Sequence, residues 1–257
     1  MTKSRMPAIF IGHGSPMNAI ENNVYTASWE KIGQDLVRPK AILCISAHWY
    51  TDKTVTSDTK QPKQINDFYG FPEELYVLKY PVIGSPEIAK KIKELLEPIE
   101  NIEFDNSWGI DHGAWVPLSR LFPKADIPVA QLSINGSKPS DYHFQIGRAL
   151  REDGCLIVCS GNIVHNLGLI DFDESAIPYS WASKFDEHVS QLINSHDYKK
   201  LIDFEKLGPE AKSSIPTPEH YLPLIYFLGL QYENEEIKSF SEGISNKSLS
   251  MRSLITK

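Results

Sequence analysis

Five of the eight histidines stand at positions suited to metal ligands. Three follow short apolar runs: His13 after PAIFIG, His48 after AILCISA and His165 after CLIVCSGNIV. His112 and His220 lie in WGIDHGAW and IPTPEHYLP, whose Gly, Pro and aromatic content is typical of loops with a fixed backbone. Neutral imidazole binds first-row metals such as Zn, Fe, Ni and Cu. Because the spacings are long and irregular, only tertiary folding can assemble such a site.

A single histidine after a strand is more often a hydrogen-bonded structural residue than a ligand. Three histidines in equivalent positions favour a shared site. The remaining three, His143, His188 and His196, fall within or near amphipathic patterns and are predicted to be solvated.

Polar residues adjoin the key histidines and are candidates for orienting them, since ligating imidazoles usually hydrogen-bond through their second nitrogen. These candidates are Asp111, Asn162 and Glu219. A loop carboxylate is more often merely exposed, so both interpretations stay open. The segment GHGSP at 12–16 lacks the lysine of a phosphate-binding loop and the G-x-S-x-G of a serine nucleophile. Gly14 and Pro16 are therefore expected to shape the turn that holds His13.

The elements that carry these residues alternate between strands and helices. Apolar runs that stop at loops predict buried strands, and amphipathic stretches with capping residues predict helices. The predicted strands cover 7–11, 41–47, 127–132 and 155–160, and the predicted helices cover 85–96, 141–151, 180–194 and 217–228. This order predicts an α/β fold, a single three-layer domain over 1–257 with a mostly parallel or mixed central sheet flanked by helices. Ligands of such folds bind at the carboxyl ends of the strands.

The composition of the chain indicates which classes of binding partner to expect. The chain has 257 residues, of which 41% are hydrophobic and 23% charged, and its net charge is −7. An acidic chain without a basic run is not expected to bind nucleic acid or an anionic membrane. The apolar run near the N-terminus breaks at 12–14, too early for a signal sequence or a membrane span. Three cysteines in apolar runs, Cys44, Cys155 and Cys159, predict reduced core thiols and a cytoplasmic protein.

Six segments together resemble a known family. In chain order they read IFIGHGSPMNAI, ISAHWYT, FYGFPEELY, DHGAWVPL, SGNIVHNL and TPEHYLPL, and they extend from residue 9 to residue 224. They are similar to the LigB-type class III extradiol ring-cleavage dioxygenases, within the small single-subunit branch called 4,5-DOPA extradiol dioxygenase.

The resemblance implies roles for the histidines. His13, His48 and His220 correspond to positions that bind one divalent metal ion. His165 corresponds to an additional ligand in a resting zinc form or to the acid/base histidine of a ferrous form, and His112 to a histidine that supports the site or faces the substrate. Heterodimeric relatives use a Glu where this chain has His220. Three or four nitrogens suit zinc, so zinc is expected in protein as purified, and Fe(II) for ring cleavage.

The implied reaction is extradiol cleavage of a catechol such as DOPA with O₂ to give a muconic semialdehyde. His165 is the first choice for the base that accepts and returns a proton, and His112 is the second. The expected partners are a small aromatic diol and O₂. Two alternatives stay open: a zinc hydrolase that uses the same histidines, and a non-catalytic binding relative of the fold.

Overall fold

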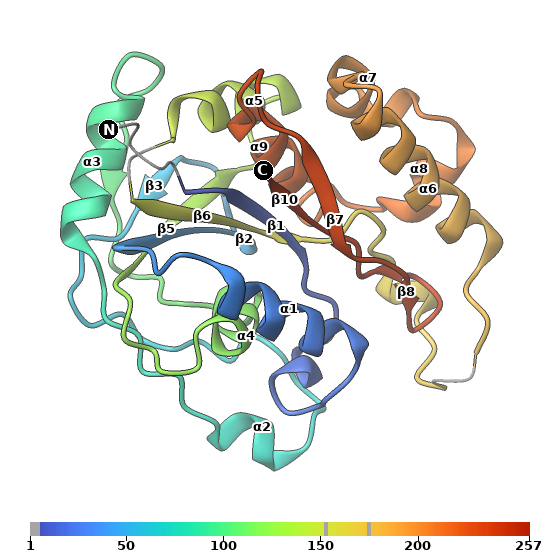
Figure 1. Cartoon of the computed structure of the whole chain (residues 1–257), viewed down its shortest axis with the longest axis horizontal. Coiled ribbons are helices and arrows are strands. Elements are labelled where there is room, and N and C mark those ends of the chain that lie inside the picture. The colour runs from blue at the N-terminus through green and yellow to red at the C-terminus, as the bar shows by residue number, and fades with distance from the viewer. Residues whose placement is uncertain (1–5, 152–153, 174–175) are drawn as a thin grey trace.

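The computed structural model describes residues 6–151, 154–173 and 176–257. The described strands are β1 (Ala8–Gly12), β2 (Ala41–Thr51), β3 (Val55–Thr56), β4 (Glu103–Phe104), β5 (Val129–Asn135), β6 (Cys155–Gly161), β7 (Ile237–Ser241), β8 (Ile244–Ser245), β9 (Leu249–Ser250) and β10 (Ser253–Thr256). Eight of them form one sheet in the order β4-β3-β5-β2-β6-β1-β10-β7 (Figure 1). The inner strands β5, β2, β6 and β1 are parallel, and β3 and β10 run antiparallel to their inner neighbours. The predicted mixed sheet is confirmed.

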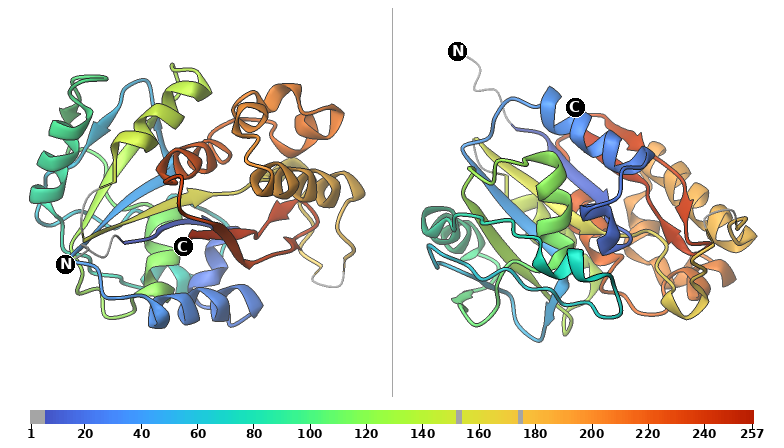
Figure 2. Two further views of the ribbon diagram at one scale, coloured as in Figure 1. Left: turned by 45° about the horizontal axis from the view of Figure 1, so that its top comes forward. Right: turned by 90° about the horizontal axis from the view of Figure 1, so that it is seen from below.

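Helices cover both faces of this sheet. The described α-helices are α1 (Val24–Asp35), α2 (Glu73–Val77), α3 (Pro86–Leu96), α4 (His112–Leu121), α5 (Ser140–Ala149), α6 (Ser180–Asn194), α7 (Tyr198–Ile202), α8 (Pro209–Ser214) and α9 (Leu222–Leu230). Short 3₁₀ helices are η1 (Pro16–Ala19), η2 (Leu167–Leu169) and η3 (Phe204–Lys206). Figure 2 shows α1 and α4 together on one side of the sheet, with α5 and α9 on the other.

Two apolar cores separate these layers, because strand residues alternate between the faces. Ile9 packs with Trp29 of α1 and Trp115 of α4 on one face. Phe10 packs with Phe227 of α9 and Ile146 of α5 on the other. The predicted three-layer α/β architecture is confirmed.

Several predicted boundaries agree with the structure. Helix α6 has the predicted bounds, and α3 begins after Ser85, whose hydroxyl caps the helix by accepting from the N–H of Ile88. The helix predicted over 217–228 begins later, at Leu222, because turns occupy the preceding residues. The strand predicted over 41–47 continues to Thr51, since Tyr50 and Thr51 still pair with β5. His48 therefore lies inside a strand rather than after it.

Two predictions about the solvent exposure of histidines were wrong or incomplete. His143 is fully buried on α5 instead of solvated, because α9 packs over that face of the helix. His196 is exposed and His188 is half-buried.

The three cysteines are free and buried, as predicted. Within the described residues, no helix is both long enough and apolar enough to span a membrane.

Candidate metal centre

His13 lies directly after β1 in a tightly held turn. Its N–H donates to the carbonyl of Gly161 at the end of β6 over 3.1 Å, and its carbonyl accepts from Asn18 Nδ2 over 3.0 Å. Gly14 follows with a φ of 59°, the left-handed region that favours glycine. A Cβ at that position would also lie 2.5 Å from Met251 Sδ. Gly14 thus shapes the turn as expected.

His48 and His112 share one carboxylate, that of Asp67. His48 lies on β2 beyond Ser46, the last residue that pairs with β6, and its Nδ1 is 2.9 Å from Asp67 Oδ2. His112 is the first residue of α4, not a loop residue as predicted, and Asp111 caps the helix. Both the backbone N–H and Nδ1 of His112 lie 2.9 Å from Asp67 Oδ1.

His220 reaches the same place from the segment before α9. Its carbonyl accepts from the N–H of Asn162 over 2.8 Å, just beyond β6. Gly161 permits this approach, since a Cβ there would lie 2.2 Å from that carbonyl. The ring Nδ1 lies 3.1 Å from Glu219 Oε1, so Glu219 is in position to orient His220 as anticipated.

His165 lies against His220 rather than among the other three rings. Its backbone N–H donates to the Ser214 carbonyl over 2.8 Å. The rings of His165 and His220 are parallel, with centroids 3.4 Å apart and planes inclined by 5°. Donor atoms of His165, Glu219 and His220 lie within 4.8 Å of one another.

The rings of four histidines form one cluster. The centroids of His13, His48 and His220 are separated by 5.2, 5.3 and 5.1 Å. His112 completes the cluster, 3.9 Å from the His48 ring and 5.9 Å from that of His13. Donor atoms of His13, His48 and His112 lie within 4.8 Å of one another, and the Nε2 atoms of His13 and His48 are 3.3 Å apart.

The hydrogen bonds at Nδ1 fix which nitrogen of each ring carries the proton. Ser160 donates its hydroxyl proton to the Gly113 carbonyl, so its oxygen accepts from His13 Nδ1, 3.0 Å away. Ionised carboxylates accept only, so His48 and His220 also carry their protons on Nδ1. All three rings therefore have an Nε2 lone pair free of a proton, and those of His13 and His48 face each other.

Facing lone pairs without a proton between them are unfavourable unless a cation lies among them. His220 Nε2 is buried and makes no hydrogen bond with any described residue. Two nitrogens bound to a tetrahedral ion at about 2.0–2.1 Å lie about 3.3 Å apart, which matches the separation of the His13 and His48 Nε2 atoms. The donor set fits a divalent metal ion.

Burial keeps most of the cluster neutral. It is the largest cause that lowers the pKa of His13 and His220 far below the usual value, and neighbouring histidines lower both further. Burial first, then the charge of His48, lowers the pKa of His165 to about 4 and also lowers the pKa of His112. Metal ligation requires neutral imidazole, so these shifts favour it.

Asp67 gives His48 a different electrostatic environment. Burial would lower the pKa of His48, but the hydrogen bond to Asp67 and nearby carboxylates raise it overall. Burial would raise the pKa of Asp67, but its hydrogen bonds to His112 and His48 hold it far below the usual range. Asp67 is therefore a carboxylate at neutral pH.

Two of the three anticipated orienting residues do not touch a histidine ring. Asp111 accepts from Ser46, Gln131 and Trp108, and the Asn162 side chain donates to the Ser250 carbonyl. Both residues are close to a candidate histidine in the sequence. The backbone at the start of α4 and at the end of β6 nevertheless directs their side chains away from the histidine rings. The groups that hold His13, His48 and His112, namely Ser160 and Asp67, were not predicted.

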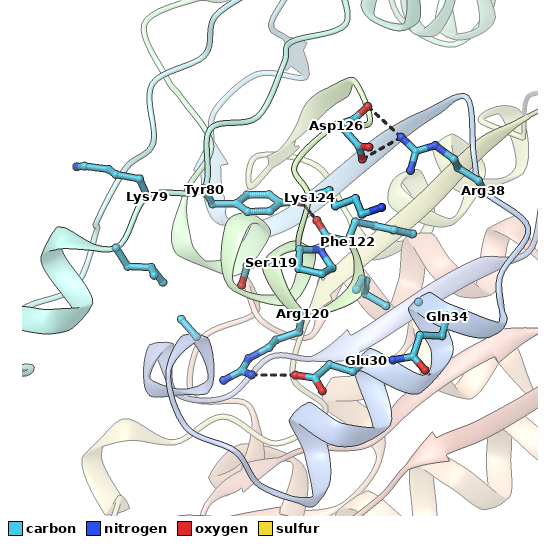
Figure 3. A pocket seen from close by; sticks show the side chains of 15 residues that line it. Glu30, Gln34, Arg38, Lys79, Tyr80, Ser119, Arg120, Phe122, Lys124 and Asp126 are labelled. Carbon is cyan, nitrogen blue, oxygen red and sulfur yellow. Dashed lines mark hydrogen bonds and ion pairs between the residues drawn. The ribbon is translucent and has the colours of Figure 1, made fainter.

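A cavity of about 760 Å³ opens beside the His13 turn. Ser15 and Asn18 line it on one side, and residues 69–72 line it on another. A second hollow of about 640 Å³ lies between α1 and α4 (Figure 3). Its interior is crossed by the ion pair of Arg120 with Glu30, and its lining includes none of the five histidines. The lining of the first cavity likewise includes none of the five histidines, but Ser15 and Asn18 place it next to the turn that holds His13.

Comparisons with known proteins identify the family of the chain. Residues 6–251 match the family model described as the catalytic LigB subunit of aromatic ring-opening dioxygenase. The chain belongs to the LigB family of aromatic ring-opening dioxygenases.

Two curated relatives have the same name. The chain is 46% identical to the 4,5-DOPA dioxygenase extradiol of Escherichia coli K12, over 99% of this chain and 96% of that protein. It is 38% identical to the 4,5-DOPA dioxygenase extradiol of Beta vulgaris, over 88% and 87% of the two chains. The crystal structure of an uncharacterized Escherichia coli K12 protein superposes with a TM-score of 0.85 at 42% identity, covering 98% of this chain and 99% of that one.

Proposed function

We propose that the protein opens the ring of a catechol such as DOPA with O₂, next to the two hydroxyls, to give a muconic semialdehyde. The observation that carries this proposal is the packing of the His13, His48 and His220 rings, whose centroids are 5.1 to 5.3 Å apart. The Nε2 atoms of His13 and His48 face each other at 3.3 Å, and His220 Nε2 is buried without a hydrogen-bond partner among the described residues. The names of the relatives and the family of the chain support the type of reaction.

The proposed cofactor is one divalent metal ion held by His13, His48 and His220. Fe(II), when bound, supplies the redox chemistry with O₂ that Zn²⁺ lacks. Because Zn²⁺ ranks above Fe²⁺ in divalent affinity, protein purified in air is expected to carry zinc and to be nearly inactive.

Residues of the chain handle the protons of the reaction. His165 is the proposed base: with its pKa lowered to about 4 it is neutral at pH 7, and so its lone pair is available for a proton from a catechol hydroxyl. The same ring then returns that proton. His112 is the second candidate, because Asp67 holds its Nδ1 and leaves Nε2 directed away from that carboxylate.

The cavity beside the His13 turn is the proposed approach for the substrate. Its aromatic lining includes Tyr25, Tyr69 and Phe71, which suit the flat face of a catechol. The ring of Phe71 packs against that of Phe68, with centroids 5.5 Å apart. The Phe68 ring in turn lies 5.5 Å from the His112 ring. Contacts between aromatic rings thus connect the wall of the cavity with the cluster.

Metal reconstitution tests the proposal. Protein stripped of metal without oxygen is loaded with either Fe(II) or Zn²⁺, and O₂ uptake and yellow semialdehyde are measured with a panel of catechols. The iron form is expected to consume one O₂ per catechol, and the zinc form almost none. If the iron form consumes no O₂ with any catechol while the zinc form hydrolyses esters or amides, the protein is a hydrolase instead.

A further inference from the structure

One carboxylate contacts two histidines of the cluster through different oxygens. Asp67 Oδ2 lies 2.9 Å from His48 Nδ1, and Oδ1 lies 2.9 Å from both Nδ1 and the backbone nitrogen of His112. Asp67 itself is mostly buried, with 17% of its side chain exposed. Water therefore competes weakly for these hydrogen bonds.

We propose that Asp67 is a positioning residue that fixes the tautomer of His48 and His112 at once. A carboxylate has no proton to donate, so both rings must carry theirs on Nδ1 and direct their Nε2 lone pairs away from Asp67. For His48 that lone pair faces His13 Nε2 at 3.3 Å. The consequence for metal binding rests on the proposed function, in which His48 is a ligand.

The segment that carries Asp67 is anchored independently of the two histidines. The N–H of Ile65 donates to the Ile110 carbonyl over 2.9 Å, and the Ile65 carbonyl accepts from Trp115 Nε1 over 3.0 Å. These bonds attach the segment to both sides of the start of α4. Asp67 is thus held in place when its charge is removed, which makes an isosteric substitution informative.

Asp67→Asn should change the tautomer of His48 and leave that of His112 unchanged. An amide offers one accepting oxygen and one donating nitrogen in place of two accepting oxygens. The backbone N–H of His112 can only donate, so the amide oxygen must stay on the His112 side. The amide nitrogen then faces His48 Nδ1, which must accept, and the proton of His48 moves to Nε2.

This exchange closes the metal site without disrupting the fold. A proton on His48 Nε2 would point at His13 Nε2 and form a hydrogen bond in place of two opposed lone pairs. The metal-free variant should therefore be as stable as the parent protein, while its His48 no longer offers a lone pair. A merely structural Asp67 would instead cost stability and leave the tautomer unchanged.

The test reads tautomers directly in metal-free protein. Long-range ¹⁵N–¹H NMR of ¹⁵N-histidine-labelled protein near pH 8 separates rings protonated on Nδ1 from those protonated on Nε2. In the parent protein we expect both His48 and His112 on Nδ1. In Asp67→Asn we expect His48 on Nε2 and His112 unchanged, and a fall in Zn²⁺ affinity on the order of 10- to 100-fold.

Asp126→Asn is the matched control. Asp126 is an exposed carboxylate paired with Arg38 over 2.9 Å, far from the cluster, so its loss should change neither tautomers nor Zn²⁺ affinity. A His48 that keeps its proton on Nδ1 in Asp67→Asn overturns the inference, as does an Nε2 proton on His48 in the parent protein. A changed His48 tautomer with unchanged Zn²⁺ affinity supports the role of Asp67 and removes His48 from the proposed ligand set.

Discussion

The buried histidine His143 should make the stability of the protein depend on pH. Its Nδ1 lies 3.0 Å from the Tyr226 hydroxyl in the layer between α5 and α9. Burial lowers its pKa from 6.5 to about 4, and a contact with the Lys138 backbone opposes this only in part. A pKa difference of one unit between the folded and unfolded states corresponds to about 1.4 kcal/mol of unfolding free energy. The full lowering of the His143 pKa therefore corresponds to about 3 kcal/mol.

The sign follows from which state binds the proton. In the unfolded chain the ring protonates near pH 6.5, whereas in the folded protein its lowered pKa keeps it neutral down to about pH 4. Between these values the unfolded state binds more protons, so acid favours unfolding. The contribution of His143 is complete above pH 6.5 and is lost as the pH falls toward 4.

His143→Asn isolates this effect, because the amide reaches the Tyr226 hydroxyl and does not titrate. Urea unfolding of both proteins, metal-free and at several pH values from about 7.5 to about 4.5, gives the difference in unfolding free energy. The other histidines titrate alike in both proteins and cancel. We expect the parent protein to lose about 2 to 3 kcal/mol relative to the variant over this range. A difference that stays within about 0.5 kcal/mol at every pH refutes the reasoning.

Three further predictions concern the site itself. Replacing His13, His48 or His220 by Ala should sharply reduce bound metal, measured by elemental analysis, while the circular dichroism spectrum is kept; full metal stoichiometry would contradict the ligand set. His165→Ala should still bind metal and catechol but lose on the order of 10²- to 10⁴-fold in kcat of the iron form, and unchanged turnover would reject both roles considered for it. Tyr69→Ala should raise KM for catechols several-fold with little change in Tm, since Tyr69 is 91% exposed on the cavity wall; an unchanged KM would place the substrate elsewhere.

The sequence predicts the architecture well because strand ends are easy to recognise. His13 follows an apolar run that forms β1, and the parallel arrangement brings that strand end beside the end of β6. Gly161 there accepts a bond from His13 and lies against the His220 backbone. A rule that treats carboxyl ends of strands as one edge therefore indicated the place where the structure brings these histidines together.

Other parts of the site leave no periodic pattern in the sequence. Asp67 lies in an irregular segment, and its contacts with His48 and His112 exist only after folding. The helix that begins at His112 was obscured by Gly113 and by Pro117 within it, although Asp111 is a recognisable capping residue. His143 looked solvated because the pattern of α5 does not reveal that α9 covers it.

The placement of β1 has a consequence for how the protein is made. This strand precedes its sheet neighbours β6 and β10 by a long stretch of chain, so they are synthesised much later. A nascent chain therefore holds β1 without its sheet neighbours until β6, which begins 143 residues after the end of β1, has emerged. Such distant pairing slows folding. His13 and His220 meet only after that. The proposed metal site is consequently completed late in folding, after the segment before α9 has joined the end of β1.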